Sequence, residues 1–223
     1  MRIIQPSAEL LRPQTEEGGL IALRAIEAMA RISHKSEDAQ TNDSWRRFLQ
    51  AVVIEHGDWS VVEHATASVL FRVDRGITHE LVRHRLFAYT QESTRFVNYQ
   101  KKGGELEFIM PNGWFASSSD TKIWSWVQSI QAAETEYLTM LGCGAKPQEA
   151  RSVLPNALAS TIGMTGNLRA WRWFFLARTS RESHPDMRRV TIPLLAVFKQ
   201  RIPLLYDDIE PESRQIDNFK KAH

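Results

Sequence analysis

The sequence has little cysteine, no long apolar run and no glycine-rich phosphate-binding loop. The single cysteine, Cys143, excludes an intrachain disulfide and any zinc site built on several thiolates. No apolar run could span a bilayer and the N-terminus does not resemble a signal peptide, so we expect a cytoplasmic protein without a membrane partner. Because neither a G-x-G-x-x-G nor a Walker-type motif occurs, a phosphate group would be bound by side chains and helix ends.

The sequence also has no large excess of positive or of negative charge. The 28 basic and 26 acidic residues nearly balance, which speaks against a nucleic-acid-binding module. His56 and His64 lie eight residues apart, but no strong metal-binding spacing occurs, so we expect no metal. There is no internal repeat or low-complexity linker, and residues 1–223 are therefore predicted to form one domain.

Hydrophobic periodicity predicts a mixture of helices and strands without the regular alternation of a doubly wound sheet. From Tyr206 onward the sequence is predicted to be a polar, partly disordered tail. The expected strands are residues 1–6, 64–74, 108–110 and 159–165, and the expected helices are residues 19–32, 44–56, 78–86, 121–141, 147–153, 167–178 and 186–201.

The segment HELVRHRLFAYTQESTRF concentrates anion-binding side chains. Arg83, His84 and Arg85 are followed, after seven residues, by Ser93, and Arg95 comes soon after. Arginine suits phosphate because its planar guanidinium donates two parallel hydrogen bonds. A solvated basic helix is the ordinary interpretation of such a triplet, but the polar run that follows it in fixed order favours a phosphate-bearing ligand.

A second cluster follows in the segments PQEARSVLP and NLRAWRWFFLART. Arg151 is expected in a short helix, and the next helix carries Asn167 at its start, aromatic residues in its middle and Arg178 near its end. Such a helix could line a flat ring system, although an aromatic core helix with flanking arginines is the commoner arrangement.

Taken together, these segments resemble the flavin-dependent thymidylate synthases. The signature of that family is Arg-His-Arg, seven residues, then Ser, which here is Arg83 to Arg85 and Ser93. The upstream DWSVVEH, the downstream PQEARSVLP and NLRAWRWFFLART, and SHPDMRR also match in order and spacing. The similarity covers about residues 2–209.

The resemblance implies an α+β fold, with a small mostly antiparallel sheet flanked by long helices, that assembles as a homotetramer with composite active sites. It also implies reductive methylation of dUMP to dTMP, with 5,10-methylenetetrahydrofolate as carbon donor, FAD as cofactor and NADPH as reductant. The flavin removes the need for a protein nucleophile. Accordingly, Cys143 is interpreted as incidental and Ser93 as a nucleotide ligand.

Residue by residue, the resemblance assigns Arg178 as the catalytic group that polarises the pyrimidine. The positions that it implies for flavin binding are Ser60, Arg83, His84, Arg85, Gln91, Asn167, Leu168, Arg169 and Trp173. The positions that it implies for nucleotide binding are Glu80, Leu81, Val82, Arg83, Gln91, Glu92, Ser93, Thr94, Arg95, Arg151 and Arg178.

Three positions depart from the family pattern. Trp173 replaces the usual histidine or asparagine, Asp58 replaces a histidine, and Gln91 replaces a glutamate. These changes leave open whether UMP is methylated in place of dUMP. A pyrimidine C5-hydroxymethylase on the same scaffold and a non-catalytic flavin- or nucleotide-binding protein are further alternatives.

Overall fold

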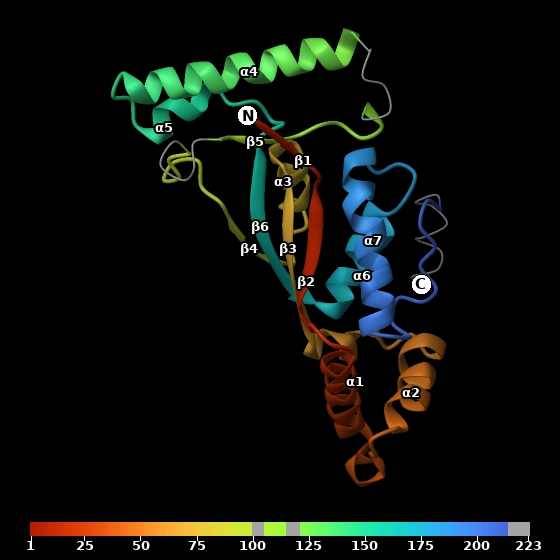
Figure 1. Ribbon diagram of the computed structural model, residues 1–223. Helices are drawn as coiled ribbons and strands as arrows, with labels where there is room; N and C mark the ends of the chain where they lie inside the picture. The colour runs from red at the N-terminus through yellow and green to blue at the C-terminus, as the bar shows by residue number, and fades with distance from the viewer. Residues whose placement is uncertain (100–104, 115–120, 214–223) are drawn as a thin grey trace. The chain divides into compact units, whose positions relative to one another are not determined.

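The computed structural model describes residues 1–99, 105–114 and 121–213 (Figure 1). The chain groups into two compact units, each assembled from separate segments. The first unit comprises Met1–Ser7, Phe71–Arg83 and Thr90–Ile162, and the second comprises Ala8–Leu70, His84–Tyr89 and Gly163–His223. That the whole chain forms one domain stays a prediction.

The strands form a small sheet and a separate strand pair. The four-stranded sheet has the order β2-β3-β6-β4, and it confirms the predicted α+β class with a small antiparallel sheet. A parallel pair joins β1 to β5, with Ile3 opposite Phe108. The strands are β1 (Arg2–Ile4), β2 (Ser7–Arg12), β3 (Thr66–Asp74), β4 (Ala88–Gln91), β5 (Glu107–Ile109) and β6 (Ala159–Asn167).

The helices lie close to the predicted ranges. Short 3-10 turns cover Ile32–His34, Glu37–Ala39, Trp59–His64 and Arg151–Val153, and a π-helical segment covers Gln50–Glu55. The α-helices are α1 (Glu16–Arg31), α2 (Ser44–Leu49), α3 (Arg75–Leu81), α4 (Thr121–Gly142), α5 (Pro147–Ala150), α6 (Leu168–Arg178) and α7 (Pro185–Arg201).

The helix expected over residues 44–56 is confirmed, because the chain is α-helical over Ser44–Leu49 and π-helical over Gln50–Glu55. One helix prediction was wrong in its bounds. The helix expected over 78–86 begins at Arg75, because the Asp74 side chain accepts a hydrogen bond from the backbone N–H of Ile77. It ends at Leu81, which leaves the Arg-His-Arg triplet in the turn before β4.

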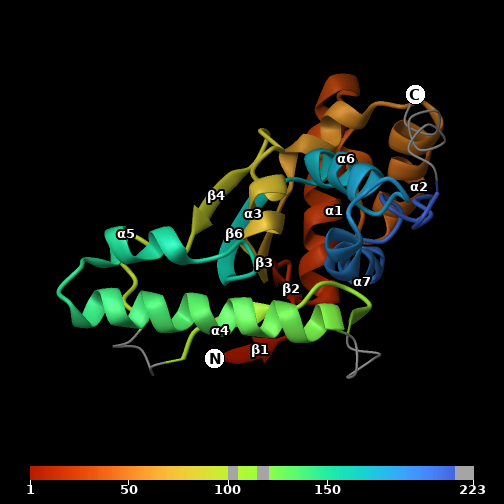
Figure 2. The same ribbon diagram turned by 90° about the horizontal axis from the view of Figure 1, so that it is seen from above.

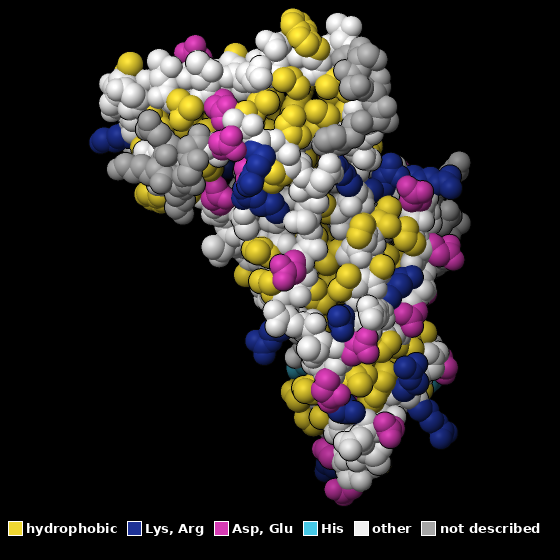
Figure 3. Space-filling model, viewed as in Figure 1, with side chains coloured by type: hydrophobic (Ala, Val, Ile, Leu, Met, Phe, Trp, Pro, Cys, Tyr) yellow, Lys and Arg dark blue, Asp and Glu magenta, His cyan; other side chains and the backbone are white. Residues whose placement is uncertain are grey.

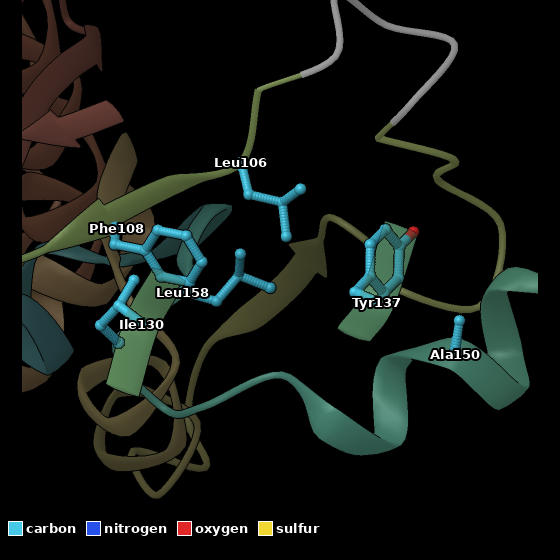
Figure 4. Packing of buried hydrophobic residues seen from close by; sticks show 6 residues of the cluster. All are labelled: Leu106, Phe108, Ile130, Tyr137, Ala150 and Leu158. Carbon is cyan, nitrogen blue, oxygen red and sulfur yellow. The ribbon is translucent and has the colours of Figure 1, made fainter. Parts of the chain in front are cut away.

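The core of the first unit lies beneath α4. Phe108 of β5, Leu158, and Ile130 and Tyr137 of α4 pack together and are almost fully buried (Figure 4). Helix α5 lies alongside α4, so the segment that carries Arg151 is fixed to the same core (Figure 2).

The core of the second unit is aromatic and lies between α6 and α7, which pack together. Trp171, Phe175 and Phe198 are fully buried with their ring centroids 4.8–5.9 Å apart. Helix α1 packs against α7 so closely that a Cβ at Gly19 would overlap the carbonyl group of Arg201.

The predicted start of the polar tail was wrong. Tyr206 is fully buried and its hydroxyl donates to the carbonyl of Leu168 at 2.9 Å, and Ile209 is also buried. The guanidinium of Arg172 pairs with the carboxylate of Asp208 through two hydrogen bonds of 2.6 and 2.7 Å, which ties this segment to α6. The rest of the expected tail, 214–223, lies outside the described residues.

Candidate active site

Helix α6 carries the predicted residues of the second unit at its two ends. Its N-cap is Asn167, whose side-chain oxygen accepts from the backbone N–H of Ala170 at 2.7 Å. Leu168 is fully buried, its N–H donates to the carbonyl of Ala65 and its carbonyl accepts from the hydroxyl of Tyr206, so its side chain is unavailable to a ligand. Arg178 is the last residue of the helix, where a cation is favoured by the helix dipole.

The Arg178 side chain meets the Arg-His-Arg motif. Its Nε lies 2.8 Å from Nε2 of His84 and donates a hydrogen bond to it, although the two residues are 94 positions apart in the sequence. The hydroxyl of Tyr89 donates to the carbonyl of His84 at 2.7 Å. The second unit thus brings together the residue predicted to be catalytic and one predicted to contact the flavin.

The surroundings of His84 keep its imidazole neutral. Its ring packs edge to face with Phe174 at 5.0 Å between centroids and lies 6.4 Å from Phe87. Burial and, secondarily, the positive charge of Arg178 lower the pKa of His84 from 6.5 to about 4. Burial also raises the pKa of Tyr89 to about 12, against the opposing effect of Arg178. Both groups are therefore uncharged near pH 7.

The depressed pKa of His84 predicts a loss of stability in mild acid. The unfolded chain takes up a proton as the pH falls below about 6.5, whereas the folded state does so only near pH 4. We therefore expect the free energy of unfolding to decline between these values. Urea unfolding of the unaltered protein and of His84→Gln, measured from pH 7 to pH 4, should show the shallower decline for the variant. Equal slopes would contradict the depressed pKa.

The remaining predicted residues of the second unit differ in their exposure and in their contacts. Arg169 pairs with Glu63 at 2.6 Å on the surface. Ser60 and Arg85 are exposed, and the Arg85 guanidinium has no partner in the part of the chain that the structure describes. Trp173 is half-buried on α6. The exposed side chains of Ser60 and Arg85 are available to a ligand, and the assignment of all these positions to a flavin stays a prediction.

In the first unit, Glu92 lies in a network of charges and hydroxyls. Its carboxylate accepts from Arg72 at 3.1 Å and from the hydroxyl of Tyr99 at 2.7 Å. Arg72 also donates to Thr161 at 2.7 Å and pairs with Glu107. Burial, with the hydrogen bond to Glu92, raises the pKa of Tyr99 well above its usual value, so its hydroxyl stays a donor. This network fixes the segment next to Ser93.

Polar contacts also hold the other polar residues of the motif in the first unit. The side-chain amide of Gln91 donates to the hydroxyls of Thr78 at 3.0 Å and Ser160 at 3.2 Å. The Arg151 guanidinium donates to the hydroxyl of buried Thr94 at 3.2 Å. Arg151 and the motif are thus neighbours in the structure, although Arg151 and Thr94 are 57 positions apart in the sequence.

The last predicted positions of the first unit differ in exposure. Arg83 and Arg95 are exposed, and the guanidinium of Arg95 lies 5.4 Å from the ring centroid of Phe96. Leu81 is fully buried, so its side chain is unavailable to a ligand, and Glu80 is half-buried. Val82 is 40% exposed. The backbone N–H of Arg95 donates to the hydroxyl of Ser93 at 3.3 Å.

Sequence reasoning missed three residues that organise these regions. Arg72 and Tyr99 hold Glu92, and Tyr89 holds the backbone of His84. A signal was available for Arg72, because it is a charged residue between Phe71 and Val73 in a strand that alternates between buried and half-buried positions. A charge in such a strand needs a partner.

The described residues show neither a membrane-spanning helix nor a cluster of metal-binding side chains. Among residues 1–99, 105–114 and 121–213, no helix is long and apolar enough to cross a membrane. Over the same residues, no group of three or more His, Cys, Asp or Glu side chains could hold a metal ion. On the face drawn in Figure 3, basic and acidic side chains are interspersed rather than gathered into a basic field.

Comparison with known proteins places the chain in a family. Residues 21–204 match the Thy1 family, described as thymidylate synthase complementing protein. A flavin-dependent thymidylate synthase of Corynebacterium efficiens is 34% identical over 175 residues, which cover 72% of this chain and 68% of that protein. A flavin-dependent thymidylate synthase of Corynebacterium aurimucosum is 31% identical over 216 residues, which cover 87% and 83%.

The fold has a counterpart among solved structures. The crystal structure of the UMP/dUMP methylase PolB from Streptomyces cacaoi, bound with 5-Br dUMP, superposes with a TM-score of 0.74 at 22% identity. The alignment covers 93% of this chain and 96% of that one. The fold and the sequence matches agree, and the chain belongs to the Thy1 family of flavin-dependent thymidylate synthases. It is an enzyme of that family.

Proposed function

We propose that this protein converts dUMP to dTMP by reductive methylation, with 5,10-methylenetetrahydrofolate as carbon donor, FAD as cofactor and NADPH as reductant. We further propose that it acts as a homotetramer with composite active sites. The observation that carries the proposal is the hydrogen bond between Arg178 and His84, which joins the predicted catalytic arginine to the signature motif.

The residues at the predicted flavin positions suit FAD. Arg83 and Arg85 are exposed cations whose side chains have no partner among the described residues, and such cations suit the diphosphate. The neutral ring of His84 retains an N–H on Nδ1 that can donate to a flavin oxygen or nitrogen. Bound FAD would supply the reducing equivalents, and the protein would supply orientation and charge.

The first unit offers a phosphate site of matching chemistry. Among the described residues, Arg151 donates to Thr94 through Nη1 alone, so its guanidinium has further N–H groups for a phosphate oxygen. Ser93 and Arg95 lie in the same turn, and Arg95 is exposed. These residues would hold the nucleotide phosphate. Arg178, in turn, would stabilise negative charge that develops on the uracil ring.

The decisive experiment is an anaerobic incubation of the purified protein with FAD, NADPH, 5,10-methylenetetrahydrofolate and dUMP, with the product identified by mass. We expect dUMP to gain one methyl group. A hydroxymethyl product would identify the protein as a pyrimidine C5-hydroxymethylase. If FAD were bound and reduced while dUMP stayed unchanged, the protein would bind flavin without catalysing the reaction.

UMP is the second candidate substrate. The structural counterpart is a UMP/dUMP methylase, and Gln91 provides a neutral amide where the family usually has a carboxylate. The Gln91 amide donates to the hydroxyls of Thr78 and Ser160, so its position in the structure is fixed by these two hydrogen bonds. A parallel incubation with UMP separates the substrates, and faster methylation of UMP would make the protein a ribonucleotide methylase.

The proposed mechanism predicts that the only cysteine is dispensable. Cys143 is exposed, directly after α4. We expect Cys143→Ala to keep kcat within about twofold of the unaltered enzyme, since the chemistry would not use a thiolate. Steady-state turnover with dUMP is the measurement. A folded but inactive variant would show that the reaction requires a protein nucleophile.

A further inference from the structure

The hydrogen bond between Arg178 and His84 fixes the protonation of the histidine. Nε of an arginine can only donate, so Nε2 of His84 must carry a lone pair and the ring proton must reside on Nδ1. The lowered pKa of His84 agrees with this neutral form. The imidazole is thus an acceptor toward Arg178 and keeps one donor, which has no partner among the residues described.

The imidazole is itself held firmly. Phe174 packs edge to face against its ring, and Tyr89 anchors its carbonyl. Phe87 is the other aromatic neighbour, and its ring lies so close to Gly166 that a Cβ there would overlap it. The position of the acceptor is therefore set by packing within the second unit.

The other end of the arginine is fixed as well. The backbone carbonyl of Arg178 accepts from the hydroxyl of Thr191, a fully buried residue of α7, at 2.8 Å. With the backbone held and Nε–H directed at His84, the plane of the guanidinium is determined. The N–H groups on Nη1 and Nη2 lie in that same plane, which is the geometry that planar recognition of an anion requires.

We propose that His84 is the positioning residue of Arg178: its Nε2 orients the guanidinium toward the pyrimidine, while its Nδ1–H remains a donor for the cofactor. The inference rests on the proposed function and adds to it. His84 would then contact the groups that bind both ligands: its Nε2 accepts from Arg178, which polarises the nucleotide, and its Nδ1–H is available to the flavin.

A double-mutant cycle tests this role. His84→Leu removes the acceptor, His84→Gln keeps one in its side-chain oxygen, and Arg178→Lys keeps the charge but lacks the planar guanidinium. In the enzyme with Arg178, we expect His84→Leu to lower kcat with dUMP about tenfold, which corresponds to the loss of one hydrogen bond to a charged group. His84→Gln should recover most of this loss. In the Arg178→Lys enzyme, His84→Leu should change kcat less than about twofold.

Two binding measurements accompany the cycle. FAD affinity is measured by flavin fluorescence and dUMP affinity by calorimetry, with circular dichroism to confirm folding. Weaker dUMP binding by His84→Leu only when Arg178 is present would support the positioning role. Equal losses in both backgrounds, or a loss confined to FAD affinity, would overturn it. If the unaltered protein binds dUMP but methylates no nucleotide, the proposed function fails, and the binding cycle still decides the role of His84.

Discussion

Replacing Arg178 by alanine is expected to lower kcat for dUMP methylation by about 10²–10³-fold, the usual effect of removing one preorganised group that stabilises a developing charge. The resemblance implies that the Arg178 guanidinium, at the end of α6, polarises the pyrimidine, and Nε of this guanidinium donates to His84. Alanine removes both the charge and the donors. Because Arg178 is half-buried and not part of the aromatic core, the fold should persist.

The measurement is steady-state turnover with saturating dUMP, together with light scattering to report assembly. Arg181→Ala is the matched control, because Arg181 is an exposed arginine three residues further along the same segment. We expect the control to keep turnover within about twofold. If Arg178→Ala lost its assembly to the same degree as its turnover, the residue would be structural rather than catalytic.

Most of the fold could be predicted from local patterns. In β3, Ala67, Val69, Phe71 and Val73 are buried while the residues between them are not, as the alternation in the sequence predicts. Helix α4 was predicted to within one residue at either end. Local patterns succeed in such elements because one face of each must be apolar over its whole length.

The errors arose where distant contacts decide the structure. The segment after Tyr206 contains Asp207, Asp208 and Glu210, and was therefore interpreted as solvated. Arg172, a residue more than thirty positions earlier, donates to the carbonyl of Leu205 and to the carboxylate of Asp208, and the Tyr206 ring is fully buried. No window of local sequence contains that information. The helix predicted over residues 78–86 also passed the end of α3 by five residues.

In the candidate site, too, local motifs could be predicted from the sequence and contacts between distant residues could not. The spacing of the Arg-His-Arg motif and the resemblance that it carries identified His84 and Arg178 separately, but not their hydrogen bond, which joins residues 94 positions apart. Glu92 was predicted to bind the nucleotide, yet its carboxylate is occupied by Arg72 and Tyr99. The kind of interaction that a side chain can make could be predicted from its residue type. The distant residue that forms a hydrogen bond with that side chain could not.

Gly19→Ala is expected to lower the free energy of unfolding by about 3 kcal/mol, at the upper end of the usual cost of overpacking. Gly19 is buried on the face of α1 that meets α7, and a methyl group there would overlap the carbonyl oxygen of Arg201. A backbone carbonyl cannot rotate away as a side chain can. The two helices must therefore separate, which would disturb packing along their whole contact.

Urea unfolding of the variant and the unaltered protein gives the difference directly. The matched control is Gly142→Ala at the end of α4, where an added Cβ would meet nothing within 4 Å. There, alanine should be neutral or stabilise by up to about 1 kcal/mol, because it restricts the unfolded chain and favours the helix. If both variants had the same stability, close packing of α1 against α7 would not explain why glycine occupies position 19.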